Sequence, residues 1–310
     1  MSNVEIVFLG TASMVPSPER NHPSVFFRYF GDCFLLDCGE GTQRQLIKSG
    51  IFPTKIDYIF ISHWHGDHSL GVPGILESIS YFSPHKKVVL IGPEGTKKSI
   101  EFLEKAFKLK SLPNIEVIEC ALEKGAVVKV IDKDDYYVEV IGLDHNVPTL
   151  GFSFKEKDKL KADKQKLKEF GLYNNPLVGK LKRGETIEIN GKIVRPEDIL
   201  TKIKGMKVTY IVDTRIFPEL IEFVKDSDIL IVECMYSLEH KDIAREYKHL
   251  SVEDVVTLID EGNVREVYIT HVSQRYRGKE NKIIKDIRER ISNKEVSIKL
   301  AEDFMRIVIR

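Results

Sequence analysis

A short cluster of metal-binding side chains constrains the fold of this chain most strongly. The apolar stretch Tyr58–Ile61 predicts a strand, and it runs directly into the sequence Ser-His-Trp-His-Gly-Asp-His at residues 62–68. In an extended or tightly turned chain, residues two apart point the same way, so His63 and His65 can reach one ion. Gly66 permits the sharp turn that follows. The strand must therefore end where other ligands gather.

The motif continues with a carboxylate and an imidazole, from Asp67 and His68, that face a neighbouring position. Three histidines and one aspartate within six positions, in a chain with only nine histidines, are not explained by packing. Imidazole combined with carboxylate is the ligand mix that zinc accepts at catalytic sites. The motif alone supplies too few donors for two ions, so further ligands must come from elsewhere in the chain.

Three residues just beyond predicted strands supply the missing donors. His145, Asp213 and His271 each follow an apolar stretch, and open α/β sheets place their ligands at the carboxyl ends of strands. A histidine at a strand end is more often a structural residue, but the neighbouring motif makes a ligand role the better interpretation here. We expect His63, His65 and His145 on one ion, Asp67, His68 and His271 on the other, and Asp213 shared between them.

Strands and helices alternate in both halves of the chain, which indicates an α/β layered fold. Strands are expected at Val4–Leu9, Val25–Tyr29, Val208–Val212 and Val267–Thr270, and a helix at Ser251–Glu261. The chain has 310 residues, of which 42% are hydrophobic, enough to bury a large core near the upper size of one domain. We therefore expect one domain over residues 1–310.

The segment Lys155–Gly184 interrupts this alternation. It carries ten basic and four acidic side chains and few large apolar ones, whereas the whole chain is neutral, with 47 basic and 47 acidic residues. A charged run is usually a solvated surface. An insertion of about 30 residues is long for a connection in a compact domain, however, and such insertions are usually functional or disordered.

The cysteines and the hydropathy pattern indicate a cellular compartment. None of Cys33, Cys38, Cys120 and Cys234 forms a CxxC pair, so they are interpreted as thiols in a reducing environment. No stretch approaches the roughly 20 apolar residues that cross a bilayer. We expect a soluble cytoplasmic protein that contacts no membrane.

Several further segments, read together with the metal motif, resemble the ribonuclease Z family of the metallo-β-lactamase superfamily. They span nearly the whole chain: Pro16–Asn21, Asp37–Gln43, His68–Gly74, Val212–Arg215 and His271–Tyr276. The resemblance implies a four-layer αβ/βα sandwich and a homodimer with two Zn²⁺ per subunit. It also implies an endoribonuclease that removes the 3′ trailer of precursor tRNA by attack of metal-activated water after the discriminator nucleotide, leaving a 3′-hydroxyl on the tRNA.

The resemblance also assigns roles to individual residues. The family's metal ligands fall on His63, His65, Asp67, His68, His145, Asp213 and His271. Its proton acceptor falls on Asp67, and its histidine that gives a proton to the leaving group falls on His249, just before the predicted helix with Ser251 as N-cap. Glu233 corresponds to a glutamate that would orient this histidine. Val232 stands where the family has another histidine.

The charged segment at residues 155–184 lies where the family carries a flexible tRNA-binding arm, although Asn174-Asn175 replaces the family's Pro-Gly. Lysines without interleaved aromatic residues suit phosphate contacts on folded RNA. Two other functions stay open from the residues alone: a small-molecule hydrolase such as a phosphodiesterase on the same dimetal scaffold, and a nucleic-acid-binding protein with a structural metal. Histidine ligands favour zinc but also accept manganese or iron.

Overall fold

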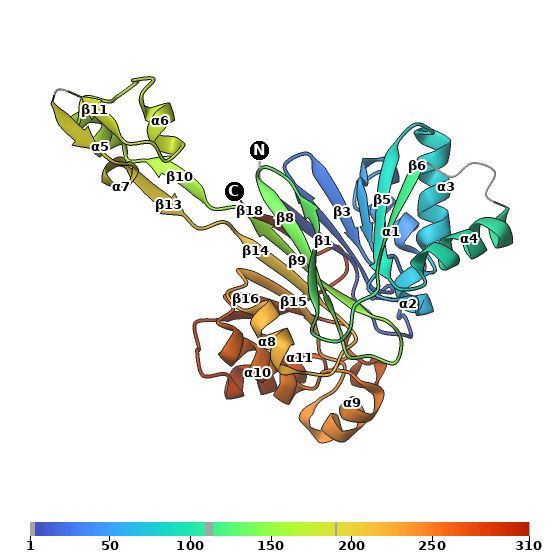
Figure 1. Ribbon diagram of the computed structural model, residues 1–310. Coiled ribbons are helices and arrows are strands. Elements are labelled where there is room, and N and C mark those ends of the chain that lie inside the picture. Colours follow the sequence, from blue (N-terminus) through green and yellow to red (C-terminus); the bar gives the residue numbers. More distant parts are fainter. Residues whose placement is uncertain (1–3, 109–113, 190, 310) are drawn as a thin grey trace. The chain divides into compact units, whose positions relative to one another are not determined.

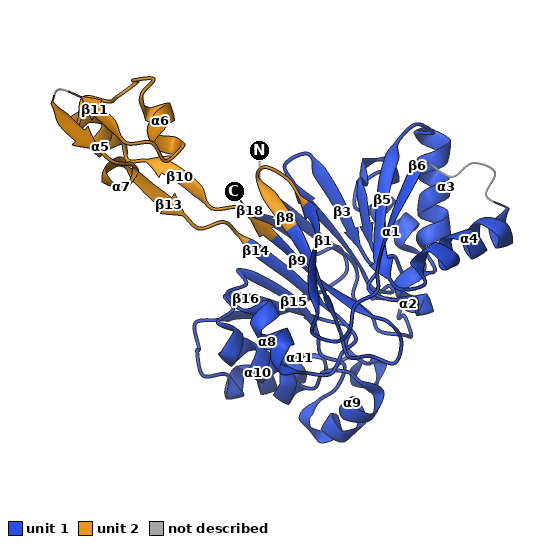
Figure 2. Ribbon diagram, in the orientation of Figure 1, with its two compact units in different colours: residues 1–131, 138–154, 207–310 blue, residues 132–137, 155–206 orange. Residues whose placement is uncertain are grey.

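The computed structural model describes residues 4–108, 114–189 and 191–309 (Figure 1). The chain forms two compact units, which Figure 2 distinguishes by colour. The larger unit contains the chain up to Ile131, the segment Val138–Phe154 and the chain from Lys207 onward. The smaller unit contains Asp132–Tyr137 and Lys155–Met206. No helix in the described ranges is both long and apolar enough to cross a membrane.

The first of two large sheets carries the metal motif at the end of a central strand. Its seven strands lie in the order β18-β1-β2-β3-β4-β5-β6. Their bounds are β1 Val4–Gly10, β2 Ser24–Tyr29, β3 Asp32–Leu36, β4 Tyr58–Phe60, β5 Lys87–Pro93, β6 Asn114–Cys120 and β18 Arg306–Ile309. Pairing is antiparallel from β18 to β3 and parallel from β3 to β6. The carboxyl ends of the parallel strands therefore share one edge.

The strands of the second sheet lead to the remaining predicted metal ligands, His145, Asp213 and His271. This sheet also has seven strands, in the order β17-β16-β15-β14-β9-β8-β7. Their bounds are β7 Val127–Asp132, β8 Tyr136–Gly142, β9 Leu150–Glu156, β14 Lys207–Ile211, β15 Ile229–Glu233, β16 Glu266–Thr270 and β17 Ser297–Leu300. The strands β14 to β17 are parallel, and β15 is buried along its whole length. A continuous apolar run is what a parallel strand covered on both faces requires.

Helices cover the outer faces of both sheets (Figure 1). Aromatic side chains of the two sheets meet between them. The helices and 3₁₀ turns of the larger unit are α1 Thr42–Lys48, η1 Pro53–Lys55, α2 Gly66–Ser69, α3 Val72–Phe82, α4 Thr96–Phe107, α8 Pro218–Val224, η2 Leu238–His240, α9 Lys241–Tyr247, α10 Val252–Gly262, η3 Gln274–Tyr276 and α11 Asn281–Arg290. Phe60 of β4 meets Phe152 of β9 with ring centroids 4.8 Å apart. The larger unit is therefore layered αβ/βα, as predicted from the resemblance.

The predicted insertion belongs to the smaller unit, which has a core of its own. Its elements are β10 Lys159–Ala162 paired with β13 Leu200–Ile203, β11 Ile187–Ile189 paired with β12 Lys192–Val194, and the helices α5 Lys164–Glu169, α6 Val178–Lys182 and α7 Pro196–Ile199. Leu172, Leu181, Val194 and Ile199 are fully buried in this core. The compact unit continues to Met206, because residues beyond Gly184 supply part of that core.

Candidate metal centre and cleft

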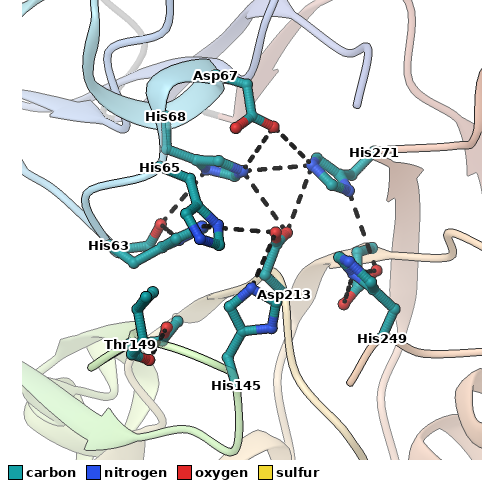
Figure 3. A network of polar contacts seen from close by, with 12 residues as sticks. His63, His65, Asp67, His68, His145, Thr149, Asp213, His249 and His271 are labelled. Atoms are coloured by element: carbon teal, nitrogen blue, oxygen red, sulfur yellow. Dashed lines mark hydrogen bonds and ion pairs between the residues drawn. The ribbon is translucent and has the colours of Figure 1, made fainter. Parts of the chain in front are cut away.

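Loops at the ends of strands in both sheets bring the predicted ligands together (Figure 3). His63 and His65 follow β4, and Asp67 and His68 lie in the short helix α2. The remaining three lie beyond strands of the second sheet: His145 beyond β8, Asp213 beyond β14 and His271 directly after β16. The sequence prediction of strand-end positions is confirmed. Two sheets that face each other thus supply one cluster from four separate segments.

The carboxylate of Asp213 lies between two groups of histidines. Its Oδ2 is 3.6 Å from His63 Nε2 and 3.9 Å from His145 Nε2. Its Oδ1 is 3.6 Å from His68 Nε2 and 3.4 Å from His271 Nε2. This is the arrangement expected of a carboxylate shared by two cations. Donor atoms form three groups within 4.8 Å: one from His63, His65, His145 and Asp213, one from Asp67, His68 and His271, and one from Asp213, Glu233, His249 and His271.

The donor set fits cations better than it fits hydrogen bonding among its own members. His145 Nε2 and Asp213 Oδ1 are buried and have no hydrogen-bond partner among the described residues. His68 Nε2 and His271 Nε2 are only 3.3 Å apart, and His63 Nε2 and His65 Nδ1 only 2.9 Å. Buried polar atoms are normally satisfied, and cations would satisfy these. The residues therefore fit a two-metal site.

A buried carboxylate, Asp37, holds one ligand in its orientation. His68 Nδ1 donates to Asp37 Oδ2 at 2.8 Å, which leaves His68 Nε2 directed at the cluster. The same oxygen accepts from Ser62 Oγ at 2.9 Å and from Tyr210 OH at 2.8 Å, while Oδ1 accepts from Ser62 N at 2.7 Å. The nearby position 39 requires glycine, because a Cβ there would come within 2.2 Å of the Asp67 carbonyl oxygen.

Positive φ angles cluster at this site. Asp37 has φ 56°, Asp213 φ 40° and His271 φ 54°. Residues other than glycine rarely adopt this left-handed region, and when they do the surrounding structure must hold them there. Two predicted ligands and the residue that orients a third ligand share this conformation. The backbone is thus held in a sparsely populated state where the donors converge.

The pKa shifts of the clustered side chains indicate which of them are charged before a cation binds. Burial raises the pKa of Asp213, but His271, His68 and other nearby histidines together lower it below its usual value, so the carboxyl is ionised. Burial lowers the pKa of His63 and of His145, which keeps both imidazoles neutral and able to bind a metal. Burial also opposes a charge on His68, yet Asp213 and Asp37 raise the pKa of His68 well above its usual value. A cation that binds His68 Nε2 must therefore displace a proton from the His68 ring.

His249 and Glu233 form a pair beside the cluster. His249 Nδ1 lies 3.0 Å from Glu233 Oε2, and Glu233 is fully buried at the end of β15. The helix α10 begins after His249 with a capping box, in which Ser251 and Asp254 satisfy each other's backbone, as predicted. Burial lowers the pKa of His249, but Glu233 and Asp213 raise it to about 9. The imidazole therefore carries a proton at neutral pH.

Five of the predicted ligands and His249 border one cleft of about 550 Å³: His65, Asp67, His145, Asp213, His271 and His249. Its lining also includes four residues for which no role was predicted from the sequence: Met14, His22, Leu70 and Tyr247. His22 was given no role from the sequence, but it lines the cleft, and its Nε2 is 3.2 Å from the Met14 carbonyl oxygen. Its position directly after Pro16–Asn21, a segment already singled out, was the available signal.

The fold and the site together define a class of protein. The chain has two facing sheets with helices outside and a His-x-His-x-Asp-His motif at the end of a central strand, which makes it a protein of the metallo-β-lactamase fold with a candidate metal site. The solved structure of the short form of human tRNase Z superposes with a TM-score of 0.70 at 25% identity, covering 99% of each chain.

Sequence comparison narrows the class to a family. Residues 4–175 match the family model described as anti-Pycsar protein Apyc1. The matched stretch does not include Asp213, His249 or His271. Ribonuclease Z of Nanoarchaeum equitans is 39% identical over 88% of this chain and 84% of its own length. Ribonuclease Z of Methanocaldococcus jannaschii is 34% identical over 97% of this chain and 95% of its own. The chain belongs to the ribonuclease Z family.

Proposed function

We propose that this protein is an endoribonuclease that removes the 3′ trailer from precursor tRNA. The observation that carries the proposal is the cluster of seven donors around Asp213 with the His249–Glu233 pair beside it, in a chain whose relatives are ribonuclease Z enzymes. The scissile bond joins the 3′-oxygen of the discriminator nucleotide to phosphorus. Hydrolysis leaves a 3′-hydroxyl on the tRNA and a 5′-phosphate on the trailer.

The cations that we propose are two Zn²⁺ ions per subunit. His63, His65 and His145 would hold one, Asp67, His68 and His271 the other, with Asp213 between them. Mostly imidazole donors with carboxylate suit zinc better than magnesium or calcium. When bound, such ions lower the pKa of water and neutralise charge on the phosphate.

The side chains around the cluster then divide the proton transfers. Asp67 would orient the attacking water and accept its proton, since its Oδ2 faces the cluster between His68 and His271 at 3.4 Å and 3.5 Å. His249 would give a proton to the departing 3′-oxygen. Glu233 would hold the His249 ring through Nδ1, leaving Nε2 for the substrate. The attacking and departing oxygens would thereby be served by different groups.

We further propose that the insertion at residues 155–184 is an RNA-binding arm. Its excess of basic side chains suits phosphate contacts, and its compact core gives those side chains a scaffold. The chain can be shortened cleanly there, because Glu156 N donates to the Met206 carbonyl oxygen at 2.8 Å. Removal of residues 158–204 with a two-residue turn should weaken tRNA binding and spare hydrolysis of a small phosphodiester.

Two further proposals concern assembly and location. A homodimer is supported by exposed large apolar side chains on three helices of the first sheet: Ile47, Tyr81, Phe82, Phe102 and Phe107. Sedimentation of the purified protein should give twice the mass of one chain. A cytoplasmic location is supported by four cysteines that are all free thiols.

The function is tested with a precursor tRNA that carries a 3′ trailer and with bis(p-nitrophenyl) phosphate as a small phosphodiester. The zinc-loaded protein should cleave the precursor, and Asp67→Ala should bind the precursor without cleaving it. Hydrolysis of the small phosphodiester with an intact precursor would instead favour a small-molecule phosphodiesterase.

A further inference from the structure

Lys248 joins two loops that carry separate parts of the site. It ends α9 and directly precedes His249, and its ammonium lies 3.0 Å from Asp144 Oδ1. The same ammonium donates to the His145 carbonyl oxygen at 3.0 Å. In return, His145 Nδ1 donates to the Lys248 carbonyl oxygen at 3.2 Å. The neighbour of His249 thus binds both His145 and the neighbour of His145.

Further contacts close this connection into a ring. Arg215 N donates to the Asp144 carbonyl oxygen at 3.1 Å, and its guanidinium lies 3.4 Å from Asp144 Oδ2. Thr214 Oγ1 accepts from Asp144 N at 3.1 Å, and Thr214 N donates to Glu233 Oε1 at 2.9 Å. Because Glu233 binds His249, the path returns to the residue beside Lys248. The loops that carry His145, Asp213 and His249 are therefore fixed to one another.

The backbone at Lys248 indicates that its side chain is needed. Lys248 has φ 58°, and the left-handed conformation after a helix is usually taken by glycine or asparagine. Lysine is not favoured in this conformation, so its presence indicates a role for the side chain. That side chain is only 26% exposed. The Asp144 carboxyl is also mostly covered, at 19%, so water screens this pair less than an ion pair on the open surface.

We propose that Lys248 is a positioning residue for the cleavage step, which holds His249 over the scissile bond by fixing its loop to Asp144. The inference rests on the proposed function, in which His249 gives the proton to the departing 3′-oxygen. The imidazole of the predicted ligand His145 contacts the backbone carbonyl of Lys248, whereas the ammonium contacts the His145 backbone and the Asp144 carboxylate. Loss of the ammonium therefore frees the loop that carries His249 and leaves the contact of the His145 imidazole in place.

Lys248→Asn tests the proposal, because asparagine accepts the left-handed backbone and lacks the ammonium. With zinc-loaded protein and precursor tRNA, kcat should fall by about tenfold to a hundredfold, since a small misplacement of a catalytic group has effects of this size. KM and zinc affinity should change by less than about threefold, because these depend on other residues. Lys248→Arg should recover most of the loss. Lys241→Asn, at the start of α9, breaks an exposed ion pair with Glu253 of α10 and should leave kcat unchanged.

The decisive comparison is made in a His249→Ala background. A residue that acts through His249 has nothing left to position, so adding Lys248→Asn should lower kcat by less than about threefold. Hydrogen exchange of the backbone at residues 244–251 should also rise in Lys248→Asn without metal or substrate, while the melting temperature stays near that of the wild type.

Other results would overturn the inference. A further tenfold loss in the double variant would show that Lys248 does not act through His249. Weakened zinc binding in Lys248→Asn would place its effect on His145 instead. If His249→Ala itself cleaves the precursor at the wild-type rate, the proposed proton donor is wrong, and this outcome is separate from a failure of Lys248→Asn alone.

Discussion

Replacing Asp37 by Asn should detach one metal ligand from its support while preserving the shape of the site. The carboxylate is fully buried and accepts four hydrogen bonds, from His68 Nδ1, Ser62 N, Ser62 Oγ and Tyr210 OH. Asparagine is nearly isosteric and tolerates the φ of 56° at this position. The change therefore removes a charge and one acceptor oxygen without opening a cavity.

The magnitude follows from the geometry of the four donors. Hydroxyl groups can rotate and accept a hydrogen bond from the new amide. The Ser62 N–H cannot, and His68 Nδ1 can accept only if the ring proton moves to Nε2, the atom that faces the metal site. Whichever way the amide turns, its NH₂ group faces either His68 Nδ1 or Ser62 N. One buried N–H without a partner costs about 1–3 kcal/mol of stability. Loss of a residue that orients a metal ligand lowers metal affinity by about tenfold to a hundredfold.

The assay is zinc affinity by competition with a chelator, combined with thermal unfolding of the metal-free protein. Tyr210→Phe is the matched control, because it removes one donor to Asp37 and leaves the charge and the His68 contact in place. It should cost about 1 kcal/mol of stability with little change in zinc affinity. Wild-type zinc affinity in Asp37→Asn would refute the reasoning that Asp37 orients His68.

Three further predictions follow from other parts of the structure. His249→Ala should lower kcat on precursor tRNA by about a hundredfold or more and leave bound zinc unchanged, measured by single-turnover kinetics and metal analysis; loss of zinc would contradict the assignment. Ser251→Ala should destabilise the protein by about 1 kcal/mol in chemical unfolding, since it removes the cap of α10; an unchanged midpoint would count against this. Excision of residues 158–204 should flatten the salt dependence of tRNA binding, because each lost phosphate contact removes about one unit from the slope; an equally steep slope would mean that the segment makes no phosphate contacts.

Much of the larger unit could be predicted because its signals are local. Apolar runs bounded by glycine, proline and aspartate marked β1, β2, β14 and β16 to within a residue or two. The His-x-His-x-Asp-His segment identified the site by itself, because its donors are adjacent in sequence. His145, Asp213 and His271 were predictable only jointly, since each follows a strand and the topology brings those strand ends together.

Other features depend on contacts between distant segments and left little trace in the sequence. Asp37 lies 31 positions from His68 and 173 from Tyr210, so its orienting role appears only after the two sheets face each other. Lys248 and Asp144 are likewise far apart in the chain. Helix α9 was not predicted. The core of the smaller unit was not predicted either, because charged residues separate its apolar positions in the sequence.

The central claim is tested most directly by mapping both ends of the cut in a precursor tRNA. The zinc-loaded protein should produce one cut after the discriminator nucleotide, with a 3′-hydroxyl on the tRNA and a 5′-phosphate on the trailer. Asp67→Ala, purified and loaded in parallel, should give neither product. An intact precursor, or cuts elsewhere with a 3′-phosphate on the tRNA, would contradict the account.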